Sequence, residues 1–146
     1  MMKAQKSDIE FLDYKITKFE YVNLLQSKEE NIKYEVRVNP QIGKIVKDDE
    51  HGKYFVRLDL ALQINGKKGR TILTKIRCSI TGLFAGSTKL NEKDFLSLCA
   101  TSGFANLIMI TRSVIISFTS QSGNIPVIMP LINLLKTYEQ NSQKKE

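Results

Sequence analysis

Residues 71–84 read TILTKIRCSITGLF, and this stretch decides the fold because apolar and polar side chains alternate along it. The apolar face carries Ile72, Thr74, Ile76, Cys78 and Ile80. Residues 54–64 alternate in the same way. Asn65-Gly66, directly after them, is a favourable turn because both residues tolerate positive φ. The two runs therefore predict a long antiparallel hairpin.

Two further strands are expected upstream of this hairpin. Residues 34–38 alternate in polarity and predict a third strand, which Pro40 and Gly43 interrupt with a bulge or bend. Residues 14–25 predict a fourth strand, and residues 26–32 are expected to form a loop.

The period of the apolar positions changes after residue 84. Asn91 and Asp94 have the spacing of a helix N-terminus, and Gly103 is expected to end or kink this short helix. Residues 104–120 predict a second helix that is apolar on nearly every side. A surface helix carries one apolar stripe, so this helix needs cover on two sides. One side can lie on the sheet, and the other requires a partner.

The chain closes with a crossover and a last helix. Gly123 stops the second helix, Pro126 and Pro130 hold an extended crossover, and residues 131–140 can form a helix before a polar tail. Strands followed by helices predict an α+β fold: a four-stranded antiparallel sheet with C-terminal helices packed on one face. A length of 146 residues allows one domain, residues 1–146, with about 9–140 ordered.

The composition and the pattern of apolar residues indicate the cellular compartment. Cys78 and Cys99 lie inside a strand pattern and a helix pattern, which is typical of small buried thiols in a reducing compartment. No apolar run follows the N-terminal lysines, so no signal peptide is expected. The longest apolar stretch, residues 107–118, is interrupted by Arg112 and is shorter than the roughly 20 residues of a membrane span. A cytoplasmic protein is expected.

The sequence offers little catalytic chemistry. His51 is the one histidine, and it lies in the acidic turn 48–52, where a solvated turn is favoured over a weak metal site because the carboxylates are consecutive. Residues 66–70 have neither the spacing nor the Ser/Thr of a P-loop. We therefore expect no enzyme, no cofactor and no metal.

The net charge of +7 leaves one alternative open. Arg57, Lys75 and Arg77 lie on the outward face of the hairpin and could meet phosphates, although Phe55 is the one aromatic side chain among them. The alternative to the function below is thus a basic regulatory or nucleic-acid-binding module. The scattered lysines otherwise indicate a solvated surface.

Four short motifs in the last third resemble those of one family. Gly82-Leu83-Phe84 is similar to a Gly-Ile-Phe at the end of a fourth strand, and residues 107–112 keep the leucine and arginine of Leu-Phe-Pro-Tyr-Ala-Arg. Residues 123–126 lie in the place of Gly-Thr-Phe-Pro, and residues 130–133 match Pro-Val-Asn-Phe as a Pro-X-X-Asn variant. The family is that of the SecB chaperones, which hold unfolded bacterial proteins for export.

This resemblance implies a dimer of dimers assembled through the helical face, with unfolded preproteins or an antitoxin held in apolar grooves without nucleotide or metal. The chain would then be an ATP-independent holdase. The expected client-binding residues are Leu83, Phe84, Leu107, Ile108 and Ile110. The expected oligomer interface comprises Met109, Val114, Ile116 and Phe118.

Charge separates this chain from the export members that it resembles. Those proteins are acidic and meet a basic, zinc-binding tail of the translocation motor. A chain at +7 would repel such a tail, so the resemblance extends better to relatives that guard antitoxins.

Overall fold

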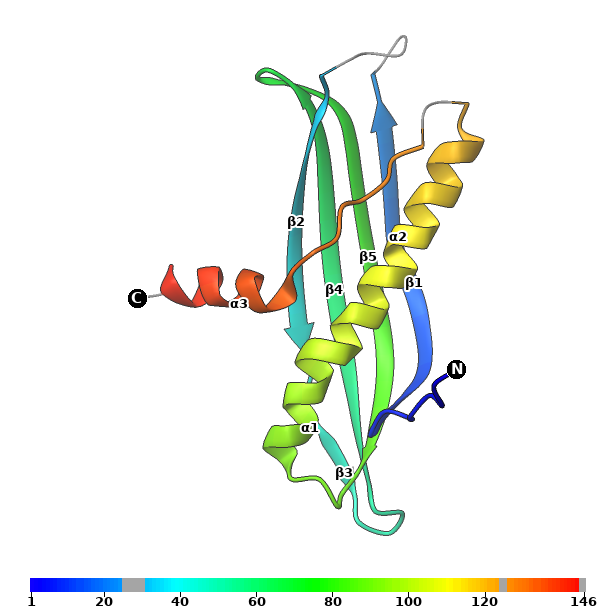
Figure 1. Ribbon diagram of the computed structural model, residues 1–146, viewed down its shortest axis with the longest axis vertical. Coiled ribbons are helices and arrows are strands. Elements are labelled where there is room, and N and C mark those ends of the chain that lie inside the picture. Colours follow the sequence, from blue (N-terminus) through cyan, green and yellow to red (C-terminus); the bar gives the residue numbers. More distant parts are fainter. Residues whose placement is uncertain (25–30, 124–125, 145–146) are drawn as a thin grey trace.

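The computed structural model describes residues 1–24, 31–123 and 126–144, which form an antiparallel sheet with a long helix packed on one face (Figure 1). The elements, in chain order, are β1 (Ile9–Asn23), β2 (Lys33–Ile42), β3 (Val46–Asp48), β4 (Lys53–Lys68), β5 (Thr71–Ser87), α1 (Glu92–Leu98), a π-helical turn (Cys99–Gly103), α2 (Phe104–Gln121) and α3 (Leu134–Gln143). The predicted α+β class is confirmed.

The sheet has the order β1-β5-β4-β2, and the short β3 pairs with the first residues of β4. The four long strands are those predicted, and β3 is an addition. The chain leaves β2 at Gly43, whose backbone N–H donates to the Arg57 carbonyl at 2.8 Å. It then returns to β4 as β3. Every pairing between strands is antiparallel.

The hairpin of β4 and β5 is longer than predicted, and its turn lies elsewhere. Asn65 and Gly66 remain in β4, opposite Lys75 and Thr74. The chain turns instead at Gly69, which has φ of 63°. The prediction of a turn at Asn65-Gly66 is therefore wrong. A Cβ atom on Gly66 would lie 3.0 Å from the ring of Tyr34, so this glycine permits a close approach beside a β-bulge.

The two outer strands also differ from expectation. β1 begins at Ile9 and contains two irregularities, between Phe11 and Asp13 and between Ile16 and Lys18. β2 runs through Pro40 and ends at Ile42, so Pro40 does not interrupt the strand, whereas the bend expected before Ile45 and Val46 occurs at Gly43. β2 is an edge strand, where a missing backbone N–H need not remove a ladder hydrogen bond. The loop expected over residues 26–32 lies mostly outside the described residues.

The core lies between the sheet and the helix. Alternate side chains of β4 and β5 point into it, from Val56 to Ile64 on β4 and from Ile76 to Phe84 on β5. The helical residues Phe95, Phe104, Leu107 and Ile115 complete it, and they are likewise buried. Each such large apolar side chain contributes about 1.5–3 kcal/mol on burial.

The helical region is continuous where an end or kink was expected. Asn91 Oδ1 accepts a hydrogen bond from the Asp94 backbone N–H at 2.8 Å, so the predicted helix start is confirmed. The path continues through the π-helical turn, in which a Cβ atom on Gly103 would approach Leu58 to 2.7 Å. The absence of a side chain at Gly103 thus allows the helix to pack closely on the sheet. α2 ends one residue beyond the predicted helix.

The joined helical run Glu92–Gln121 has 30 residues, longer than the apolar stretch seen in the sequence. By length and composition alone it could cross a membrane, and a core helix passes the same test. Here its sheet-facing side forms the core.

After α2 the chain runs along the sheet face as an extended segment, residues 126–133, which we call the strap (Figure 1). Val127 and Met129 are buried, with 3% and 0% of their surfaces exposed. The Val127 backbone N–H donates to Thr119 Oγ1 at 2.8 Å, and Arg112 Nε donates to the Met129 carbonyl at 2.9 Å. The crossover is therefore anchored to α2.

The last helix begins three residues later than predicted. Asn133 caps α3, and its Oδ1 accepts from the Lys136 backbone N–H at 3.0 Å. α3 buries none of its residues and projects past β2 (Figure 1). Its Tyr138 hydroxyl donates to the Ala100 carbonyl at 2.7 Å. The prediction of helices packed on one face therefore holds for α2 but not for α3.

We predict that Gly86→Ala lowers the free energy of unfolding by about 1–3 kcal/mol. A Cβ atom there would lie 2.6 Å from the ring of Phe95, which is fully buried and stacks on Tyr54 with ring centroids 5.1 Å apart. Urea denaturation followed by circular dichroism measures the loss. The exposed Ser113→Ala is the control and should stay within about 0.5 kcal/mol of the parent. Equal effects of the two substitutions would contradict this account of the contact.

We predict that the two cysteines resist thiol reagents in the folded protein. Cys78 and Cys99 are both free and buried, and burial raises the pKa of each thiol to about 11. Each thiol therefore stays protonated and unreactive at pH 8. Labelling with a maleimide should be slow in buffer and reach both thiols in denaturant. Fast labelling of the native chain would show that the helix does not seal this core.

Candidate polypeptide-binding surface

The N-terminal part of β1 exposes aromatic side chains next to the core. Phe11 and Tyr14 are 39% and 47% exposed, and their rings stack with centroids 6.0 Å apart. Phe11 also meets the buried ring of Phe84 at 4.8 Å. These residues pair with Phe84 and Gly82 of β5, so they lie on the side of the sheet that carries the helix. Because α2 crosses the strands obliquely, it does not cover this end of β1 (Figure 1).

A second aromatic group lies further along β1. Phe118 of α2 packs on Phe19 and Tyr21, with ring centroids 4.8 and 5.6 Å away, yet 46% of its surface remains exposed. Ile110 and Val114 precede Phe118 at four-residue steps, so all three occupy one side of α2.

Together these side chains line the margin between β1 and α2. We call it the β1 flank, and it comprises Phe11, Tyr14, Ile16, Phe19 and Tyr21 of β1 with Ile110, Val114 and Phe118 of α2. Exposed apolar side chains that gather in one place are typical of a binding site.

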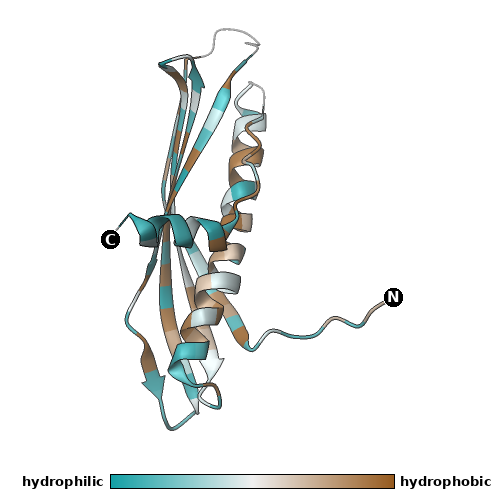
Figure 2. Ribbon diagram, turned by 60° about the vertical axis from the view of Figure 1, so that its left-hand side comes forward, coloured by the Kyte–Doolittle hydropathy of each residue, from teal (hydrophilic) through white to brown (hydrophobic). Residues whose placement is uncertain are grey.

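The C-terminal segment exposes apolar groups as well. Ile128, Leu131 and Leu135 have 63%, 85% and 63% of their surfaces exposed. Figure 2, which shows the sheet nearly edge-on, places α2 on one side of it, whereas α3 passes the edge of the sheet.

The structure separates the five residues expected to bind clients. Phe84, Leu107 and Ile108 lie in the core with 1%, 0% and 8% exposed, so they present almost no surface in this conformation. Leu83 is 44% exposed but lies on the opposite face of the sheet, because neighbouring residues of a strand alternate. Ile110 is half-buried on the β1 flank.

The four residues expected at the oligomer interface divide into two pairs. Met109 is 69% exposed, and Ile116, half-buried, shares its outward side of α2. Val114 and Phe118 turn toward β1 instead.

Sequence reasoning did not single out Phe11 or Tyr14. The irregularities after Phe11 and Ile16 interrupt the period of two along β1, which conceals the face that its side chains share. The signal that could have found them is the density of aromatic residues from Phe11 to Tyr21.

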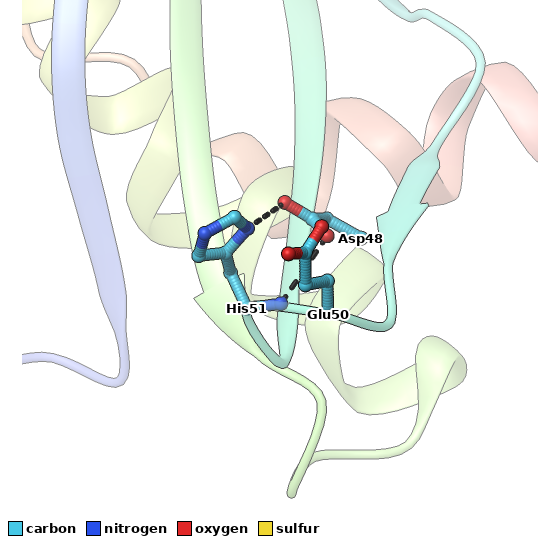
Figure 3. Close-up of side chains that lie close together, drawn as sticks. All are labelled: Asp48, Glu50 and His51. Carbon is cyan, nitrogen blue, oxygen red and sulfur yellow. Dashed lines mark hydrogen bonds and ion pairs between the residues drawn. The ribbon is translucent and has the colours of Figure 1, made fainter.

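The acidic turn is held closed by its own side chains (Figure 3). His51 Nδ1 lies 2.7 Å from Asp48 Oδ2, and the His51 backbone N–H donates to Asp48 Oδ1 at 3.2 Å. These bonds from His51 hold the pKa of the Asp48 carboxyl below its usual value. One candidate ligand atom from each of Asp48, Glu50 and His51 lies within 4.8 Å of the others. The three residues lie within four positions, from the half-buried end of β3 at Asp48 to the exposed Glu50 and His51, and the contacts described are those of a stabilised turn.

The basic residues of the opposite sheet face are only partly paired. Arg57 Nε lies 3.1 Å from Asp59 Oδ1. Lys75 and Arg77 have no ion pair within the part of the chain that the structure describes.

Comparison with known proteins identifies a fold and not a sequence family. No protein-family model matches the chain, and no curated protein matches its sequence. Among solved structures, the chain is similar to the SecB-like chaperone Rv1957 of Mycobacterium tuberculosis, in complex with a ChAD peptide from the HigA1 antitoxin. The TM-score is 0.61 at 15% identity, over 86% of this chain and 91% of that one. A protein of unknown function from Streptococcus agalactiae aligns with a TM-score of 0.46 at 14% identity, over 84% of this chain and 97% of that one.

The order of strands and the oblique helix over the sheet therefore constitute a SecB-like fold.

Proposed function

We propose that this chain is an ATP-independent holdase that binds unfolded or extended polypeptides at the β1 flank. The observation that carries the proposal is the open apolar margin between β1 and α2 on a SecB-like fold. An extended client can insert alternate side chains beside Phe11, Tyr14 and Phe118 while its backbone stays hydrated or bonds to the chaperone. Such binding needs neither nucleotide nor metal.

The proposed client is an extended segment of an antitoxin or of an unfolded preprotein. The similar chaperone from M. tuberculosis was solved with an antitoxin peptide, which supports the antitoxin class. The net charge of +7 favours the same class, because it would repel the basic tail of a translocation motor. The two free, buried thiols support a reducing compartment, and we propose a cytoplasmic location.

We further propose that the outward side of α2 joins protomers. Met109 and Ile116 cannot reach the sheet from that side, and a second copy would remove their apolar surface from water. A dimer of dimers built in this way leaves the β1 flank available to clients.

We predict that Phe11→Glu/Tyr14→Glu abolishes most holdase activity. The substitutions place two charges on the surface that should bind apolar side chains. Light scattering of a reduced, aggregating client measures the effect, and suppression should need at least tenfold more of the variant than of the parent. Thr71→Glu/Gln143→Glu adds the same charge at exposed positions outside the flank and should behave as the parent does. Equal suppression by both variants would remove the β1 flank from the proposal.

We predict that Met109→Asp/Ile116→Asp dissociates the oligomer. Multi-angle light scattering should give about four times the 16.6 kDa protomer mass for the parent and a lower mass for the variant. The charges oppose burial of this side of α2 in a second copy. Thr71→Asp/Gln143→Asp, two exposed positions outside α2, is the matched control and should affect assembly less. A monomeric parent would contradict the proposed interface.

A further inference from the structure

The sheet face opposite the helix carries a trough that crosses the strands. A hollow of about 260 Å³ lies above Ala61 and Ser79, and an adjoining hollow of about 310 Å³ shares both residues. Ala61 pairs with Ser79 across β4 and β5, and the same row continues to Lys18 on β1 and Asn39 on β2. Small side chains in the two central strands thus form the floor.

Cations from three strands border this trough. Arg77 of β5 and Arg37 of β2 both pair with Gln63 of β4, so they occupy one row beside the floor. Lys18 of β1 lies at one end, in the row of the floor itself. Three positive charges therefore converge on one hollow from residues that are far apart in the chain.

These cations retain capacity for a ligand. Arg77 is exposed and has no hydrogen bond or ion pair among residues 1–24, 31–123 and 126–144. Arg37 donates from Nε to Glu35 at 2.8 Å, which leaves its terminal nitrogens available. Lys18 meets Glu20 at 3.5 Å, with both side chains about half exposed. Such surface pairs exchange readily for a better partner.

The chemistry of the trough favours carboxylates over a nucleic acid. Neither hollow is lined by an aromatic side chain on which a base could stack. Asp59 lies on the side of the trough opposite Arg37 and Arg77, and Arg57 pairs with it at 3.1 Å, so this side offers no net positive charge to a continuous phosphate backbone. A peptide can place carboxylates at the arginines and leave neutral groups beside Asp59, because its charge is confined to chosen side chains. Guanidinium groups bind carboxylates in a bidentate manner.

We propose that this trough binds an acidic polypeptide segment, on the face of the sheet opposite the β1 flank. Arg77 and Arg37 are two strand spacings apart, or about 10 Å, which an extended peptide covers in about three residues. The segment should therefore carry two or three Asp or Glu residues within about five positions. This inference does not depend on holdase activity.

A fluorescein-labelled deca-glutamate peptide tests the proposal by fluorescence anisotropy at low salt. The full-length protein should bind it, and Arg37→Gln/Arg77→Gln should weaken binding at least tenfold. Lys93→Gln/Lys136→Gln removes the same charge from exposed positions in α1 and α3 and should weaken binding by about threefold or less. Ala61→Tyr keeps the net charge but fills the floor, and it should weaken binding at least fivefold. Circular dichroism verifies that each variant is folded.

Several outcomes would overturn the assignment. They are no binding of the peptide by the parent, equal losses in the two double variants, or an unchanged affinity in Ala61→Tyr. Tighter binding of a thymidine decanucleotide through the same arginines would identify a nucleic-acid surface instead. The client-aggregation assay distinguishes the two proposals, because Arg37→Gln/Arg77→Gln should suppress aggregation as the parent does.

Discussion

The antiparallel pairing of β4 with β5 is the interaction on which the rest of the structure depends. It aligns 16 residues of β4 with β5, from Lys53 opposite Ser87 to Lys68 opposite Thr71. One face of this ribbon provides most of the buried apolar side chains, and α2 docks on that face. The register also determines which side chains meet on the other face, where Ala61 and Ser79 become neighbours. Both candidate binding surfaces thus originate from one ladder of backbone hydrogen bonds.

The same sheet keeps the two surfaces apart. The β1 flank is apolar and lies on the face that carries α2, whereas the trough is polar, cationic and on the opposite face. Because residues of a strand alternate between faces, a substitution on one face leaves the chemistry of the other largely unchanged. The two proposed sites would allow one chain to hold an apolar segment and an acidic segment at the same time.

The sequence was sufficient to predict an element of the fold wherever its local pattern agreed with the tertiary packing. The alternation from Tyr54 to Ile80 predicted the hairpin, and the Asn91 cap predicted the first helix, because both signals are local. The turn was misplaced because Asn65-Gly66 has turn chemistry but is used for a bulge, while Gly69 provides the positive φ.

The candidate site was harder to predict than the fold. An apolar run indicates that a helix needs cover without indicating which side receives it, so Leu107 appeared available and is fully buried. The irregularities of β1 conceal Phe11 and Tyr14 from a search by period. The trough could not be found at all from the sequence, since it requires the register of four strands.

The strap has a consequence for biosynthesis. Met129 is as thoroughly enclosed as any residue of the central strands, and Val127 is nearly so, although both follow every strand and the long helix in the chain. The interior therefore remains incomplete until Met129 has emerged from the ribosome. Folding of this domain should be completed only when the strap has been synthesised, and part of the apolar, sheet-facing side of α2 stays exposed until then.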